Sequence, residues 1–113
     1  MKFQDNFRVP DDDNLYGIIY TIDSPLEIAN HFDKQGWSIR KSSWTDYEVK
    51  AEWAELEIVR NHEAALISGA IDGQKFDDLK VTLMTFEYQF SIELYDQENK
   101  LIKAATNKVQ PSS

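Results

Sequence analysis

The sequence contains no cysteine, and this absence excludes several classes of small protein. Without cysteine there is no zinc ribbon, iron–sulfur cluster, disulfide framework or cysteine nucleophile. Its four glycines lie far apart, so there is no glycine-rich phosphate-binding loop. No apolar run approaches the roughly 20 residues that span a bilayer, and the first eight residues lack the apolar core of a signal peptide. We therefore expect a cytoplasmic protein.

Positive charge is also scarce. Lys and Arg number 12 against 20 Asp and Glu, which gives a formal net charge of −8. Such a chain repels phosphate backbones and anionic lipid surfaces, so we expect neither a nucleic-acid partner nor a membrane partner. An acidic surface instead attracts a basic protein.

The chain is long enough for one packed core. Its 113 residues are 42% hydrophobic and include three Trp, five Tyr and six Phe, so we expect a single domain over 1–113. Trp37 and Trp53 are expected in the core. We expect the acidic, turn-rich residues 1–15 to form an N-terminal arm or a loose edge segment, and residues 107–113 to form a polar tail.

The clearest local signal is a helix start at Ser24. Ser24 is a favourable N-cap residue, Pro25 suits the first helical position, and Glu27 stands three residues after the cap. An apolar stripe with helical spacing follows, and Gly36 can form the left-handed turn that ends a helix. The sequence therefore predicts a helix over 24–35.

Short apolar or alternating segments predict strands over 17–22, 37–41, 47–58, 64–71, 85–95 and 101–106. The alternation slips in phase at Ala54, so the segment 47–58 requires a bulge or a tight turn. The segment 75–83 is ambiguous between helix and strand, and its apolar spacing leads us to expect a short helix.

Strands that follow one another directly predict an antiparallel sheet. The fold class is therefore α+β, with a mainly antiparallel β-sheet of about six strands. One clear N-terminal helix and the second short helix are expected on one face. The regular β-α alternation of doubly wound folds is missing.

No catalytic or metal site can be built from the sequence. We expect His31, four residues after Glu27, to make a solvated contact on the helix surface, and His62 to lie in a polar turn. The run Asp11-Asp12-Asp13 lacks the glycine and the closing glutamate of a calcium loop. We therefore expect no cofactor, no metal and no enzymatic activity.

The most distinctive polar pattern lies in the segment 44–58. If Tyr47, Val49, Ala51 and Trp53 point inward, Glu48 and Glu52 point outward, and a bulge near Trp53 keeps Glu55 and Glu57 on that same face. Lys50 is then the only cation among four carboxylates. Such a face either serves solubility alone or forms a docking surface for Lys and Arg of another protein.

Aromatic and acidic residues lie beside these carboxylates, a mixture typical of interface hot spots. The docking hypothesis names seven partner-binding residues: Trp44, Asp46, Tyr47, Glu48, Glu52, Glu55 and Glu57.

Several segments give the chain a resemblance to bacterial immunity proteins of polymorphic or contact-dependent growth inhibition toxin systems. They are Gly36-Trp37, Trp44-Thr45-Asp46-Tyr47-Glu48-Val49, Glu55-Leu56-Glu57-Ile58 and Glu93-Leu94-Tyr95-Asp96. Immunity proteins of this type are small, cytoplasmic and often acidic, and they bind and block a toxic domain, frequently a basic nuclease. The resemblance carries over no individual binding residue, because immunity families differ in fold.

The leading hypothesis is therefore a non-catalytic protein inhibitor that binds a basic toxin domain through its acidic face, as a monomer or weak homodimer. The main alternative is an acidic secretion chaperone that binds an effector protein as a dimer formed through an apolar helix. An enzyme of a type not recognised in the sequence is a third hypothesis.

Overall fold

The structure, a computed structural model, describes residues 13–107. The polar tail from 108 onward and most of the predicted N-terminal arm lie outside the described residues. The strands are β1 (Leu15–Tyr20), β2 (Ser38–Lys41), β3 (Tyr47–Ala51), β4 (Ala54–Asn61), β5 (Ala64–Ile71), β6 (Gln89–Tyr95) and β7 (Leu101–Thr106). The helices are α1 (Pro25–Lys34), the 3-10 turn η1 (Gly73–Lys75) and α2 (Phe76–Met84).

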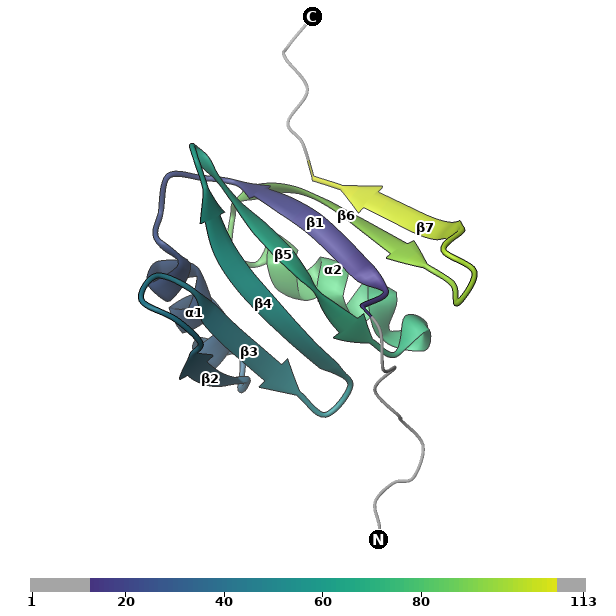
Figure 1. Cartoon of the computed structure of the whole chain (residues 1–113), viewed down its shortest axis with the longest axis horizontal. Helices are drawn as coiled ribbons and strands as arrows, with labels where there is room; N and C mark the ends of the chain where they lie inside the picture. Colours follow the sequence, from purple (N-terminus) through teal and green to yellow (C-terminus); the bar gives the residue numbers. More distant parts are fainter. Residues whose placement is uncertain (1–12, 108–113) are drawn as a thin grey trace, which may run out of the picture.

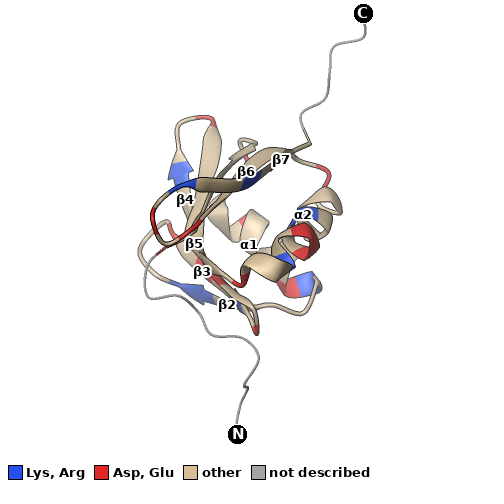
Figure 2. Ribbon diagram, turned by 90° about the vertical axis from the view of Figure 1, so that its right-hand side faces the viewer, with Lys and Arg blue, Asp and Glu red and all other residues tan. Residues whose placement is uncertain are grey.

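The strands form one antiparallel sheet in the order β2-β3-β4-β5-β1-β6-β7. Both helices lie on the same side of this sheet, as Figures 1 and 2 show from two directions. The predicted α+β class with an antiparallel sheet is therefore confirmed. The opposite face of the sheet carries no helix in the described part of the chain, and we call it the outer face.

The sheet has seven strands rather than about six, because the segment 47–58 is two strands. Ala51 pairs with Ala54, so only Glu52 and Trp53 connect β3 to β4. A two-residue turn reverses the chain and thereby produces the phase slip that a bulge would have produced within one strand. Trp53 is half-buried and packs edge-on against Trp37, with ring centroids 5.1 Å apart.

The core lies between the inner face of the sheet and the two helices. Its largest fully buried side chains are Phe32 from α1, Phe76, Leu79 and Leu83 from α2, and Leu15, Ile19, Leu56, Ile58, Ile67, Ile71 and Phe90 from the sheet, together with Ile28 of α1. Trp37 is also buried, as predicted.

The start of α1 follows the predicted capping pattern. The Glu27 backbone N–H donates to Ser24 Oγ at 3.2 Å, and the Ser24 N–H donates to Glu27 Oε1 at 2.9 Å. These bonds satisfy amides that an uncapped helix leaves without partners. Gly36, at φ +96°, lies just beyond the end of the helix. Across the described residues, neither helix combines the length and apolarity that a membrane crossing requires.

The ambiguous segment 75–83 is helical, but the strand after it begins later than predicted. The Thr85 N–H donates to Val81 O at 3.2 Å and the Phe86 N–H donates to Leu83 O at 3.1 Å, so the helical turn continues past Met84. Strand β6 therefore starts at Gln89, not near 85. Met84, Phe86 and Tyr88 alternate with polar residues as a strand would, so the sequence predicted a strand that starts too early.

The end of the predicted arm belongs to the sheet. The Asn14 side chain makes two hydrogen bonds of 2.9 Å to Ile71, donating to its carbonyl oxygen and accepting from its N–H. The Asn14 backbone N–H donates to Gly69 O at 2.9 Å. These bonds fix Asn14 beside β5 at the start of β1.

Candidate functional site

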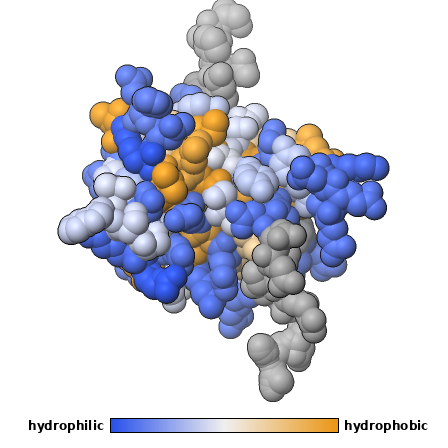
Figure 3. Space-filling view, in the orientation of Figure 1, coloured by the Kyte–Doolittle hydropathy of each residue, from blue (hydrophilic) through white to orange (hydrophobic). Residues whose placement is uncertain are grey.

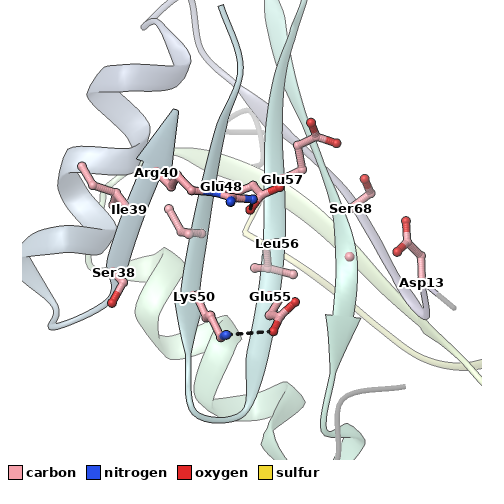
Figure 4. Close-up of a pocket in the computed structure, with 12 residues that line it drawn as sticks. Asp13, Ser38, Ile39, Arg40, Glu48, Lys50, Glu55, Leu56, Glu57 and Ser68 are labelled. Atoms are coloured by element: carbon pink, nitrogen blue, oxygen red, sulfur yellow. Dashed lines mark hydrogen bonds and ion pairs between the residues drawn. The ribbon is translucent and has the colours of Figure 1, made fainter. Parts of the chain in front are cut away.

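The outer face of β2, β3 and β4 is charged because of how these three strands pair. Side chains alternate between the two faces of a strand, so residues that are paired across strands share a face. The register places Arg40 opposite Glu48, and Glu48 opposite Glu57. Lys50 lies opposite Glu55 one step along the same strands. All five residues therefore stand on the outer face, as Figure 4 shows.

These side chains surround an open hollow of about 630 Å³, which we call the carboxylate hollow. Its lining comes from β2, β3, β4 and β5 together with Asp13. Gly69 of β5 contributes to the floor, at φ +157° and with no room for a side chain. A Cβ at this position would overlap the carbonyl oxygen of Glu55, so the glycine permits the close approach of β4 and β5.

The carboxylate hollow holds four carboxylates and two cations. Arg40 Nη2 lies 2.6 Å from Glu48 Oε1, and Lys50 Nζ lies 3.2 Å from Glu55 Oε2. Within residues 13–107, Glu57 and Asp13 have no ion pair. Glu57 accepts a hydrogen bond of 3.3 Å from Ser42 Oγ. The hollow therefore keeps an excess of negative charge beside two exposed ion pairs, which are individually weak.

Arg40 changes the charge pattern that the sequence predicts. Lys50 is not the only cation among the carboxylates, because β2 brings Arg40 against Glu48. The alternation of residues 37–41 does predict a strand. The pairing partner of that strand depends on the tertiary fold, and no local signal in the sequence could have found it.

The seven predicted partner-binding residues fall into three groups. Glu48, Glu55 and Glu57 line the carboxylate hollow. The sequence predicted Glu52 on the same face as these three glutamates. That prediction is wrong, because Glu52 lies in the exposed turn that joins β3 to β4. Tyr47 points to the inner face and packs against the core.

Trp44 and Asp46 form the third group, in the loop between β2 and β3. The Trp44 side chain is 90% exposed, and Lys41 Nζ lies 5.6 Å from the centre of its ring. Asp46 orders the loop, since its N–H donates to Ser43 Oγ at 3.2 Å and its carbonyl accepts from the Ser42 N–H at 2.9 Å. An almost fully exposed tryptophan on an ordered loop is a candidate interface residue.

The environment of His31 differs from the solvated one expected from the sequence. Its ring stacks on Phe86 with centroids 5.1 Å apart and meets Tyr88 edge-on at 5.4 Å. The segment after α2 brings these rings over α1, which the spacing of His31 and Glu27 could not indicate. His62 does lie in an exposed turn, at φ 59°. Among the described residues, no three His, Asp or Glu side chains are grouped as metal ligands would be.

Two tyrosines have raised pKa values. Burial, followed by the hydrogen bond that its hydroxyl donates to Asp23 Oδ2 at 2.6 Å, raises the pKa of Tyr88. On the outer face, the Tyr95 hydroxyl donates to Glu93 Oε1 at 2.6 Å, and this bond is the main cause of the raised pKa of Tyr95. Both hydroxyls act as proton donors to carboxylates at neutral pH and are not poised as bases.

Comparison of the chain with protein-family models, with curated proteins and with solved structures gave no significant match. The chain's own residues are therefore the basis for proposing its function.

Proposed function

We propose that the protein is a non-catalytic inhibitor of the immunity-protein type, which binds and blocks a basic toxin domain, a nuclease being the leading candidate. The observation that carries this proposal is the outer face, which neither described helix covers (Figure 2) and where the carboxylate hollow holds Glu57 and Asp13 without ion pairs among the described residues. In this role the protein acts in the cytoplasm, where such a toxin would reach its target.

The hollow suits the side chain of an arginine or lysine from a partner. An entering cation can pair with Glu57 and Asp13, and it can also compete for Glu48 and Glu55, whose exposed ion pairs contribute little stability. A chain of net charge −8 also attracts a basic domain over a distance, which speeds the encounter. An inhibitor must capture the toxin rapidly when the toxin acts inside the cell that produces the inhibitor.

The exposed loop between β2 and β3 provides a second contact. Trp44 can be buried against the partner, and burial of a tryptophan slows dissociation more than it changes association. The proposed interface therefore combines charges that set the association rate with an aromatic anchor that sets the lifetime of the complex.

The test uses the protein encoded by the reading frame next to this gene, made as an inactive variant for binding measurements. Glu55→Lys/Glu57→Lys is the charge-reversal variant, and Asp33→Lys/Asp77→Lys is its matched control. The control residues are exposed on α1 and α2, on the opposite side of the sheet. Association kinetics are measured for each at low and at moderate salt, with folding checked by circular dichroism.

We expect the first variant to associate at least tenfold more slowly at low salt and to lose the salt dependence of the wild type. The control should stay within threefold of the wild type. In cells, the first variant should fail to protect against the active toxin domain. Full protection by a folded Glu55→Lys/Glu57→Lys variant would refute the proposed role of this surface.

A dimeric secretion chaperone is the second candidate, and one observation favours it. Val81 and Met84 are exposed on α2, where an apolar helix would join two chaperone subunits. Acidic Asp77 and Asp78 begin the same helix, which limits the apolar area. A stable dimer that dissociates on Val81→Lys substitution would support the chaperone over the inhibitor.

A further inference from the structure

The outer face is charged over β2 and β3 but carries exposed apolar and aromatic side chains over the central strands. On β1 the outward residues are Tyr16, Ile18 and Tyr20, and the neighbouring strands add Leu66 of β5 and Val59 of β4. We call these five residues the tyrosine patch. Figure 3 shows apolar surface over the central strands with hydrophilic surface on either side. The solvent face of an antiparallel sheet is ordinarily polar, so this patch requires an explanation.

The patch is continuous across three strands. The register places Ile18 opposite Leu66, and Leu66 opposite Val59. Directly opposed side chains have Cβ atoms about 5 Å apart, so these three side chains are neighbours in one row across the strands. Tyr16 and Tyr20 flank Ile18 on the same strand and are 42% and 45% exposed, and Leu66 is 37% exposed.

Acidic residues border the patch at its Tyr16 end. Glu57 precedes Val59 by two residues on β4, and Glu93 of β6 lies opposite Tyr16. Tyr95 links the border to the patch, because its ring meets Tyr16 edge-on at 5.7 Å while its hydroxyl donates to Glu93. No Lys or Arg occupies an outward position on the described parts of β4, β5, β1 or β6.

We propose that the tyrosine patch is the energetic centre of the partner interface and takes an apolar or aromatic projection of the toxin domain that carries Lys and Arg beside it. This inference rests on the proposed function and adds the shape and chemistry of the partner. Tyrosines present large contact areas at low entropic cost, and an apolar centre within a charged rim is the usual arrangement of an interface.

Charge complementarity selects this occupant over a second copy of the chain. A second copy has no Lys or Arg at the outward positions of β4, β5, β1 and β6, so two copies that met through the patch would leave Glu57 and Glu93 without partner cations. A basic partner places cations there instead. Glu57 lines the carboxylate hollow and also borders the patch, so both surfaces can contact one partner at once.

The test separates association from dissociation. Tyr16→Ala and Leu66→Ala each remove a large side chain of the patch, and both side chains are outward and partly exposed. Leu26→Ala and Val81→Ala are matched controls, because they truncate apolar side chains of similar exposure on the helix side. Kinetics are measured on an inactive form of the toxin domain encoded next to this gene, at two salt concentrations.

We expect Tyr16→Ala and Leu66→Ala to dissociate at least tenfold faster, with association rates and salt dependence within threefold of the wild type. Both controls should bind as the wild type does. Tyr16→Phe should keep slow dissociation, because the ring is retained. If Leu66→Ala is poorly folded, Leu66→Thr replaces it, since threonine favours strands.

Two results would overturn the inference in different ways. If the wild type binds the toxin domain and the charge reversals in the hollow slow association, but the patch variants dissociate normally, the inference fails while the proposed function stands. If the wild type does not bind that domain at all, both fail. Sedimentation of the free protein adds a third outcome, since dimerisation abolished by Leu66→Lys would identify a second copy as the occupant and refute the basic partner.

Discussion

Glu57 destabilises the sheet but, under the proposed function, favours binding of the partner. In the β3–β4 pairing it stands directly opposite Glu48, and like charges in that position destabilise a sheet. Substitution Glu57→Lys converts the repulsive pair into an attractive one. We therefore expect the variant to be more stable than the wild type and, under the proposed function, to bind its partner less well.

The magnitude follows from the surroundings of the pair. Each cross-strand charge pair contributes roughly 0.2–1 kcal/mol, so the conversion should raise the free energy of unfolding by up to about 1 kcal/mol. Arg40, at 2.6 Å from Glu48, already offsets part of the repulsion. The exposed hydrogen bond from Ser42 to Glu57, at 3.3 Å, is lost and subtracts little. We therefore expect a gain of about 0.5 kcal/mol.

Urea unfolding at low salt measures this gain. With a slope of about 1–3 kcal/mol/M, a gain of 0.5 kcal/mol moves the midpoint upward by roughly 0.2–0.5 M at an unchanged slope. Glu63→Lys is the control, since it makes the same change of net charge in an exposed turn. The difference between the two variants should shrink at about 0.5 M salt, because salt screens exposed charges. A Glu57→Lys variant that is no more stable than Glu63→Lys at low salt would refute the reasoning.

Three further changes test the structure. Ser24→Ala removes the cap of α1 and should lower the free energy of unfolding by about 1 kcal/mol in a urea titration, whereas Ser24→Thr, which keeps a capping hydroxyl, should lose less. Gly69→Ala should cost about 3 kcal/mol, because it combines a positive φ with overlap on the Glu55 carbonyl; a near-neutral result would contradict the close strand approach. Burial, followed by the hydrogen bond to Asp23, raises the pKa of Tyr88 above its ordinary value of 10.0, so the protonated hydroxyl stabilises the fold below pH 10 and this contribution is lost as pH rises further. Stability measured between pH 8 and 11 should therefore fall less in Tyr88→Phe than in the wild type, and equal slopes would contradict this assignment.

Local signals in the sequence determined most of the elements. The capping pattern at Ser24 is complete within four residues, and it correctly marked the start of α1. The predicted strands over 64–71 and 101–106 coincide with β5 and β7, because apolar runs bounded by turn residues define their own ends. The same local patterns indicated an antiparallel α+β sheet, and net charge together with the outward glutamates suggested a basic partner, which stays a prediction.

Tertiary structure decided which residues meet. The phase slip near Trp53 was visible in the sequence, but a bulge and a two-residue turn produce the same slip, and only strand pairing distinguishes them. Arg40 reaches Glu48 through pairing of separate strands. The apolar residues of β1 and β5 indicated strands but not which face would be covered; both helices pack on one side (Figure 2) and leave Tyr16 and Leu66 exposed. Periodicity along a chain records the alternation of faces, whereas the face that is covered depends on where distant helices pack.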